Sequence, residues 1–204
     1  MKRAPALAVI WLVLAGGLPA MAKAGDACDL ALQLLGADYE RLPAQGRDEC
    51  SVPDPVRLKR LSPEIALPGE PVLQCDTARA MALWADRMLK PAAAMMPGAP
   101  RLTAIRTGPG HVCRDRVGTG KDDPKPSEHS TGSAIDVTAF EFDNGATIAI
   151  EPREGDMQTA YQAAARAGAC LFFTTVLGPG ANAAHDDHLH LDMAERNGGW
   201  RLCQ

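Results

Sequence analysis

The chain has 204 residues, a formal net charge of −4 and a hydrophobic fraction of 46%. This length is enough for one domain with a hydrophobic core. The acidic balance argues against nucleic acid and against an anionic membrane surface as partners. The composition leaves the oligomeric state open.

The first 24 residues have the pattern of a signal peptide. Lys2 and Arg3 precede the apolar run "ALAVIWLVLAGGLPA", and "AMAKA" supplies small residues at the spacing of a cleavage site after Ala22 or Ala24. The apolar run is shorter than the ~20 residues of a spanning helix. Cleavage after Ala24 removes three positive charges and takes the formal charge from −4 to −7. We therefore expect a periplasmic or secreted protein with no membrane contact after cleavage, and a retained N-terminal anchor is the alternative.

All six cysteines lie beyond the predicted signal peptide. An even number of cysteines in an exported chain is typical of disulfides, and the absence of a CxxC pair argues against a cysteine zinc site. We expect pairing between neighbours in the sequence, namely Cys28–Cys50, Cys75–Cys113 and Cys170–Cys203.

The first part of the mature chain, residues 25–69, shows little periodicity. It carries one short predicted helix, "CDLALQLLG", and is otherwise rich in proline and charge, which predicts an irregular N-terminal wrap. Helical spacing appears in "DTARAMALWADRMLK", residues 76–90, where apolar side chains share one face. Pro91 is expected to bend or end this helix.

The predicted strand "RLTAIRT" is followed by a long irregular segment that reaches residue 133. A loop of this length inside a compact domain is usually functional or disordered. The remaining predicted elements are strands at "AIDVTAF" and "ATIAIEP", a helix "DMQTAYQAAARAG" that stops at Gly168, and strands at "LFFTTVL" and "HLHLDM". Helices mixed with mainly antiparallel strands, without regular βαβ units, indicate the α+β class: a small sheet flanked by helices.

Three of the five histidines lie within the stretch "HDDHLHLDM", residues 185–193. Residues two apart in a strand point to the same face, so His188 and His190 are expected to project together. Two imidazoles on one face can share a metal, or one can bind the metal while the other handles a proton. The alternative is that these are ordinary surface or core histidines beside a solvated turn.

A second stretch, "SEHSTGSAIDV", holds His129 and Asp136. An aspartate that faces inward from a strand is costly unless it is paired or binds a metal. The small residues between the two side chains allow the loop that carries His129 to fold back onto the carboxylate. Two histidines and one carboxylate, with a fourth position open, form a catalytic zinc ligand set.

These stretches resemble known motifs. "HSTGSAID" is similar to the HxxGxAxD motif, and "HLH" to the HxH motif, of the zinc D-alanyl-D-alanine peptidases, which include the penicillin-insensitive murein endopeptidases and share a fold with the hedgehog signalling domain. The chain resembles the bacterial extensin-like C-terminal family more closely, through "CRDR", "TTVLGPGANAAHDDHLHLDM" and the terminal "RLC". The resemblance covers residues 70–204 and implies a hedgehog/DD-peptidase-like zinc domain there.

The resemblance also implies roles for individual residues. His129, Asp136 and His190 would be zinc ligands, and His188 the general base or the stabiliser of the transition state. His185 would orient His188 or contact substrate, against the alternative of a solvated loop histidine. Arg114 resembles an arginine used near the scissile carbonyl or the substrate carboxylate, against the alternative of an exposed loop arginine. The glutamate base of related carboxypeptidases has no counterpart here.

The resulting expectation is a zinc-dependent hydrolase that cleaves amide bonds in the stem or cross-link peptides of peptidoglycan. The first alternative is a non-catalytic cell-wall binding module that retains zinc. A zinc carrier is a further alternative, but the sequence lacks the histidine-rich flexible tract usual for that role.

Overall fold

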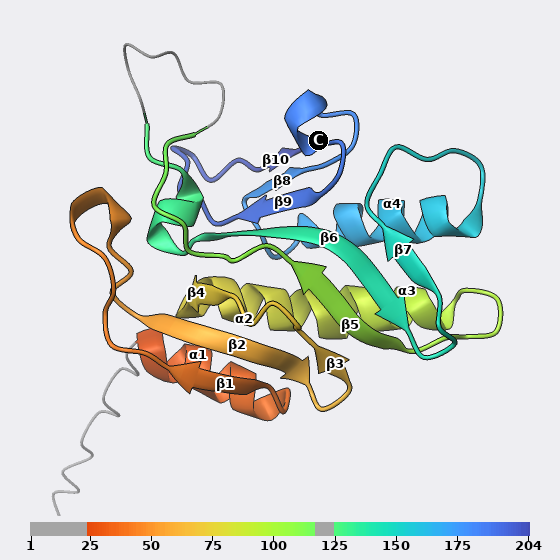
Figure 1. The fold of residues 1–204 in the computed structure, drawn as a ribbon, viewed down its shortest axis with the longest axis horizontal. Coiled ribbons are helices and arrows are strands. Elements are labelled where there is room, and N and C mark those ends of the chain that lie inside the picture. Colours follow the sequence, from red (N-terminus) through yellow and green to blue (C-terminus); the bar gives the residue numbers. More distant parts are fainter. Residues whose placement is uncertain (1–23, 117–124) are drawn as a thin grey trace, which may run out of the picture.

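The computed structural model of the protein describes residues 24–116 and 125–204 (Figure 1). Almost all of the predicted signal peptide lies outside these residues. Within them the helices are α1 (Ala24–Leu34), α2 (Cys75–Trp84), α3 (Lys90–Ala94) and α4 (Met157–Ala169). The helices of this described part are all too short or too polar to span a bilayer.

The described residues form one sheet of ten strands. Its main path runs β1-β2-β3-β5-β6-β9-β8-β10, while β4 pairs with β2 and β7 pairs with β6. All pairs are antiparallel except β3 with β5 and β8 with β10. This architecture confirms the predicted α+β class. The strands are β1 (Asp38–Arg41), β2 (Pro55–Ser62), β3 (Ile65–Ala66), β4 (Val72–Gln74), β5 (Leu102–Thr107), β6 (Ala134–Phe142), β7 (Thr147–Ala149), β8 (Thr175–Leu177), β9 (Leu189–Asp192) and β10 (Leu202–Cys203).

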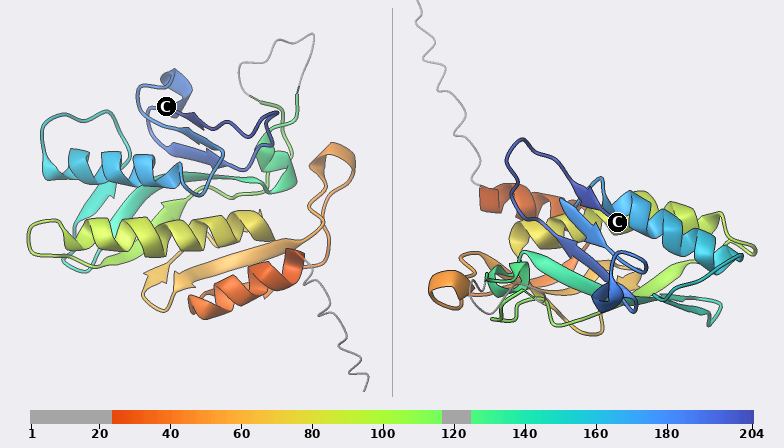
Figure 2. Two further views of the ribbon diagram at one scale, coloured as in Figure 1. Left: turned by 180° about the vertical axis from the view of Figure 1, so that it is seen from behind. Right: turned by 90° about the horizontal axis from the view of Figure 1, so that it is seen from above.

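The helices cover one face of the sheet and leave the other uncovered, as the view from behind shows (Figure 2). Trp84, at the end of α2, joins the two layers. Its ring meets Phe140 of β6 and Phe173 edge-on, with ring centroids 6.1 and 6.3 Å apart, and its indole N–H donates to the carbonyl of Ala165 in α4 at 3.0 Å. Burying such large rings in specific edge-on contacts fixes how the helices sit on the sheet.

The predicted irregular wrap of residues 25–69 is wrong, because this region supplies β1, β2 and β3. In β2 the fully buried Val56 and Leu58 alternate with the partly exposed Arg57 and Lys59. This alternation is the signal of a strand with one buried face. The flanking prolines and the high charge of the region obscure it in the sequence.

Two of the three predicted disulfides are also wrong. The pairs are Cys28–Cys75 and Cys50–Cys113, with Cα atoms 6.0 and 5.4 Å apart, and only Cys170–Cys203 is as predicted. Because α1 packs beside α2, Cys28 lies next to Cys75, the first residue of α2. Contacts between distant segments thus bring together cysteines that are far apart in the sequence.

The long helix does not end at Pro91. A π-helical turn, Ala85–Leu89, follows α2, and the chain then continues into α3 with Pro91 in its first turn. Leu89 and Lys90 keep right-handed helical backbone angles, and the N–H of Lys90 bonds the carbonyl of Ala85, so the π-helical turn carries the helix past the proline.

Gly168 does not stop α4, which runs on to Ala169. A Cβ atom at Gly168 would lie 2.8 Å from the Cε atom of Met88. The glycine therefore permits close packing of α4 on the π-helical turn, and does not provide a left-handed cap. The strand predicted at residues 171–177 is shorter, because only Thr175–Leu177 pair and Phe173 turns into the core.

Candidate metal centre

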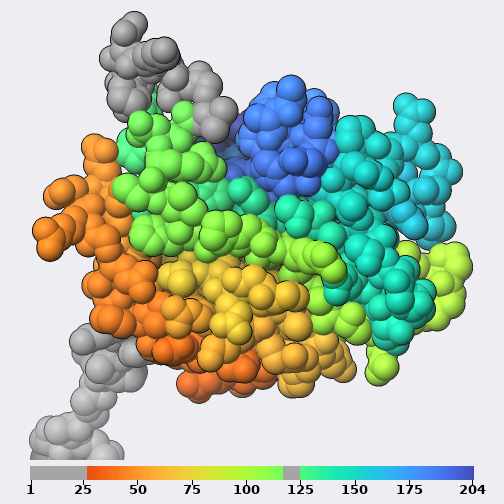
Figure 3. All heavy atoms as spheres, in the orientation of Figure 1, coloured from red at the N-terminus to blue at the C-terminus, as the bar shows by residue number. Residues whose placement is uncertain are grey.

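Strand pairing places Asp136 directly opposite His190. The two residues are Cα partners in the antiparallel pair β6–β9, and His190 Nδ1 lies 2.9 Å from Asp136 Oδ1. Leu189 and Leu191, on either side of His190, are fully buried in the core. Because side chains alternate along a strand, Asp136 and His190 face the side of the sheet that the helices leave uncovered. On that side, the segment after β5 (green) lies beside the C-terminal segments (blue) in Figure 3.

His129 reaches the same point from the short 3₁₀ helix η3 (Glu128–Thr131). The hydroxyl of Ser127 accepts the backbone N–H of His129 at 3.3 Å and caps this turn. His129 Nε2 lies 3.2 Å from Asp136 Oδ2 and 3.3 Å from His190 Nδ1. The three candidate ligand atoms all lie within 4.8 Å of one another, so this group could hold a metal ion.

Gly132, which ends η3, is the glycine of the HxxGxAxD pattern, and the structure shows why a glycine stands there. Its φ is +67°, and a Cβ atom would lie 2.9 Å from the backbone nitrogen of Gln74. Left-handed backbone and close approach to another chain segment both favour glycine. The turn that delivers His129 thus depends on this residue.

We expect Gly132→Ala to lower the free energy of unfolding by about 1–3 kcal/mol, since it adds backbone strain and a steric contact. Chemical denaturation followed by circular dichroism measures this change. Gly145→Ala is the matched control, because Gly145 has φ +82° but no heavy atom within 4 Å of its Cβ position. Equal losses in the two variants would show that the contact with Gln74 is unimportant.

The outer nitrogen of each ligand histidine has a fixed partner. His129 Nδ1 donates to the carbonyl of Gly110 at 2.8 Å, and His190 Nε2 donates to Asp192 Oδ2 at 3.1 Å. These bonds leave His129 Nε2 and His190 Nδ1 as the ring atoms that face Asp136. Such outer partners commonly orient metal-binding histidines. Two imidazole nitrogens and one carboxylate oxygen with fixed tautomers fit a zinc ion that keeps a fourth position open.

The electrostatics of the metal-free site centre on His190. Burial acts to lower the pKa of His190, but its hydrogen bonds to Asp136 and Asp192 outweigh burial and raise the pKa to about 9. Burial likewise acts to raise the pKa of Asp136, yet hydrogen bonds from His129 and His190 hold that pKa well below its usual range. At neutral pH the metal-free site therefore holds an imidazolium between two carboxylates.

Zinc binding should consequently release a proton from His190 and weaken as the pH falls. Because the metal competes with the proton on Nδ1 below the His190 pKa of about 9, zinc affinity should drop about tenfold per pH unit between pH 8.5 and 6.5. Competition with a chromophoric chelator across this range measures the slope. An affinity independent of pH would contradict the charge state of the site.

Asp192 bonds a candidate ligand, His190, and the sequence interpretation missed it. It lies two positions after His190 in β9, and its side chain is 7% exposed. Its Oδ1 accepts the backbone N–H of Ala194 at 3.0 Å, so its carboxylate is fixed on both sides. The signal was present, because "HLHLD" places His188, His190 and Asp192 on one face of a strand.

Asp192→Asn should weaken zinc binding by about 10–100-fold, the usual effect of losing a partner of a ligand histidine. The asparagine still accepts the N–H of Ala194 but no longer offers a carboxylate to His190. Zinc competition assays on the folded variant measure the loss. Asp187→Asn, at a 91% exposed carboxylate bonded to His188 instead, should leave zinc affinity within about twofold of the wild type.

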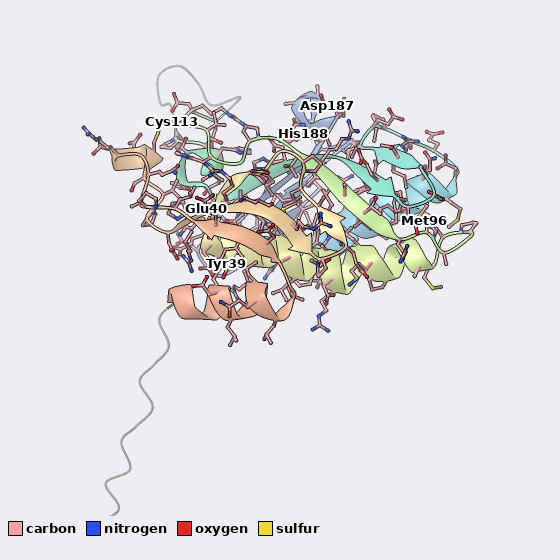
Figure 4. All side chains as sticks on the ribbon, turned by 60° about the horizontal axis from the view of Figure 1, so that its bottom comes forward. Tyr39, Glu40, Met96, Cys113, Asp187 and His188 are labelled. Atoms are coloured by element: carbon pink, nitrogen blue, oxygen red, sulfur yellow. A yellow bond between two sulfur atoms is a disulfide. The ribbon has the colours of Figure 1, made fainter. Side chains whose placement is uncertain are left out.

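The structure places His188 beside the three candidate ligands. Its Nε2 lies 3.7 Å from Asp136 Oδ1, while its Nδ1 is 2.8 Å from Asp187 Oδ1. His188 and Asp187 lie on the side of the molecule away from α1 (Figure 4). His188 thus shares the face of His190, as the strand period predicts, and its Nε2 is directed toward the candidate ligands.

His185 belongs to the same cluster, at the end of the 3₁₀ turn η4 (Ala183–His185). Its ring centroid lies 5.2 Å from that of His188 and 5.7 Å from that of His190. Its Nδ1 bonds Asn182 Oδ1 at 2.8 Å. Burial, and then the two neighbouring histidines, lower the pKa of His185. The ring therefore favours the neutral form beside the cluster.

Arg114 lines a cavity that it shares with His185, His188 and His190. Its side chain is exposed, but its backbone is fixed. Ser130 of η3 accepts the N–H of Arg114 at 3.0 Å and donates to its carbonyl at 2.7 Å, and the neighbouring Cys113 is bonded to Cys50. The cavity has a volume of about 300 Å³. Of the six predicted site residues, all but the more deeply buried His129 line it: Arg114, Asp136, His185, His188 and His190.

The comparison with protein families agrees with the motifs. The model of the extensin-like protein C-terminus matches residues 26–204. No match was found among the curated proteins or the solved structures. The match starts well before residue 70, so it includes the N-terminal strands as well as the segments that carry His129, Asp136 and His190. The chain therefore belongs to the extensin-like C-terminal family.

Proposed function

We propose that this protein is a zinc-dependent hydrolase that cleaves amide bonds in the stem or cross-link peptides of peptidoglycan. The observation that carries the proposal is the convergence of His129 Nε2, Asp136 and His190 Nδ1 within 4.8 Å, at a cavity that also holds His188. A purely structural metal site is normally closed by four protein ligands. Here three candidate ligands converge among the described residues, and the imidazole of His188, which is not one of them, lies beside Asp136.

Zinc would supply Lewis acidity, which makes a water molecule acidic near neutral pH and polarises an amide carbonyl. His188 handles the proton in this proposal. Asp187 holds its Nδ1, so Nε2 is the atom that accepts the proton of the attacking water and returns it to the leaving amine. An imidazole can do both near neutral pH.

Arg114 and His185 would complete the site. A guanidinium close to the scissile bond can stabilise the negative charge that develops on the carbonyl oxygen. Arg114 lines the cavity from a segment fixed by Ser130, which suits this role. His185 lies against His188 and would hold that ring in place or contact the substrate.

The substrate class follows from the motifs and the compartment. The HxxGxAxD and HxH patterns resemble those of zinc peptidases that act on D-alanyl peptides, and we propose the same hedgehog/DD-peptidase-like fold for this chain. Three disulfides indicate an oxidising compartment, and together with the predicted signal peptide they favour the periplasm or the exterior of the cell.

Muropeptide profiles test this function. Purified peptidoglycan is incubated with zinc-loaded protein, chelator-treated protein and zinc-loaded His188→Ala protein. Loss of a cross-linked or D-alanine-ended species only with zinc and His188 both present supports the hydrolase and identifies the bond. An unchanged profile with one tightly bound zinc per chain would instead support the non-catalytic binding module.

A further inference from the structure

The cavity at the metal centre has two chemically different ends. His185 and His188 precede β9, whereas Arg196 follows Asp192, the last residue of β9, and bonds Thr174 and Thr175. Arg114 and Arg116 line the cavity as well. Strand register supports this order, since Asp192 pairs with Ala134 at the start of β6 and with Thr175 at the start of β8. One end of the cavity is therefore imidazole and the other is cationic.

Several charged side chains of the cavity are already paired, although the side chain of Arg114 bonds only the backbone carbonyl of Asp115 in the described part of the chain. Arg116 bonds Glu128 at 2.7 Å, while Asp136 and Asp192 are bonded to the ligand histidines. Arg196 forms no ion pair with any carboxylate of residues 24–116 and 125–204. It is thus a positive charge at the cavity without a negative partner in the described part of the chain.

Arg196 is nevertheless held in a defined position. Its Nη1 donates to the carbonyl of Thr174 at 3.0 Å and its Nη2 to Thr175 Oγ1 at 2.5 Å. Its guanidinium lies 4.8 Å from the centre of the Trp200 ring. A planar guanidinium fixed by two hydrogen bonds and an aromatic ring keeps further N–H groups for a ligand, and its geometry matches a carboxylate.

We propose that Arg196 anchors a carboxylate of the substrate, so that the cavity takes peptides with a free carboxylate close to the scissile bond. The identity of the reaction rests on the proposed function, but the binding preference does not. Arg196 and the candidate ligands line one cavity of about 300 Å³, so a short peptide can contact both. A charge-assisted pair of this kind is expected to favour a carboxylate over a neutral amide by about tenfold.

A competing role for Arg196 lies within the protein itself. Thr175, which accepts from Arg196, also bonds Asp192, and Asp192 holds His190. Through this series of hydrogen bonds Arg196 would act on the candidate metal ligand His190 instead of on substrate. The test must therefore measure zinc affinity as well as peptide binding.

The experiment titrates zinc-loaded protein with N-acetyl-D-alanyl-D-alanine and with its C-terminal amide, using calorimetry. Every protein in this titration, including the one with the native Arg196 that serves as the wild type, also carries His188→Ala so that the peptides are not hydrolysed. We expect the wild type to bind the carboxylate about tenfold more tightly than the amide. Arg196→Gln should remove this preference while its zinc affinity stays within about twofold of the wild type. Arg116→Gln, at an arginine already paired with Glu128, is the matched control and should keep the preference.

Three results would overturn the inference: equal binding of the two peptides by the wild type, a preference retained in Arg196→Gln, or a loss of zinc affinity in that variant as large as its loss of preference. If Arg196→Gln does not fold, Arg196→Met, which keeps an apolar stem against Trp200, replaces it under the same criteria. A carboxylate preference without any hydrolysis would defeat the proposed function alone. Hydrolysis without the preference would defeat this inference alone.

Discussion

Asp136→Asn should abolish tight zinc binding. The carboxylate lies 3.2 Å from His129 Nε2 and 2.9 Å from His190 Nδ1, so it is the central member of the three candidate ligands. Its replacement removes the one carboxylate among the three candidate ligands of the described residues. We expect the affinity to fall by more than the roughly 10–100-fold that follows loss of an outer partner. Zinc stoichiometry after gel filtration and competition with a chelator measure the effect.

The matched control is Asp143→Asn, the same substitution at the turn that follows β6. Asp143 accepts hydrogen bonds from the backbone and side chain of Arg101 and takes no part in the metal centre. This variant should bind one zinc per chain with unchanged affinity. Full zinc binding by Asp136→Asn would place the metal site elsewhere and would remove the basis of the proposed chemistry.

His188→Ala should separate catalysis from metal binding. Loss of a general acid–base group typically lowers a rate by about 10²–10⁴-fold. His188 is not among the three converging ligands, since its Nε2 is 3.7 Å from Asp136 and its Nδ1 is held by Asp187. The variant should therefore retain one zinc per chain while its turnover of a peptidoglycan peptide collapses.

His185→Ala provides the comparison within the same cluster. Because His185 contacts His188 and is not placed to exchange the proton itself, its loss should reduce turnover less than the loss of His188. Both variants are measured at saturating zinc. Unchanged turnover in His188→Ala would assign the base to another group, and loss of zinc would make His188 a ligand.

The convergence of His129, Asp136 and His190 was predictable because its determinants are local. The period of a strand alone puts His188 and His190 on one face, and the buried Leu189 and Leu191 on the other face agree with it. The spacing of His129, Gly132 and Asp136 reflects a tight turn that leads into β6, which a short motif can encode. Asp192 obeys the same strand period, but it lies outside the histidine motifs that mark the site in the sequence.

The errors concern contacts between distant parts of the chain. Cys28 pairs with Cys75 because two helices lie side by side, which no spacing within either helix reveals. The alternation of apolar and polar residues in β2 is short and contains several charged residues, so it is hard to recognise in the sequence. The apolar side chains of β2 become buried only when the strand pairs with β1 and β4. Gly168 looks like a helix stop in sequence, yet its role is set by Met88 on another helical segment.

The most direct test of the proposed catalytic metal centre is a zinc titration of chelator-treated protein, with hydrolysis of one defined peptidoglycan peptide as the readout. The rate should rise in proportion to bound zinc, level off at one zinc per chain, and remain at background throughout in Asp136→Asn. A protein that fills with one zinc per chain and hydrolyses nothing, or one whose hydrolysis does not follow zinc occupancy, would contradict this account.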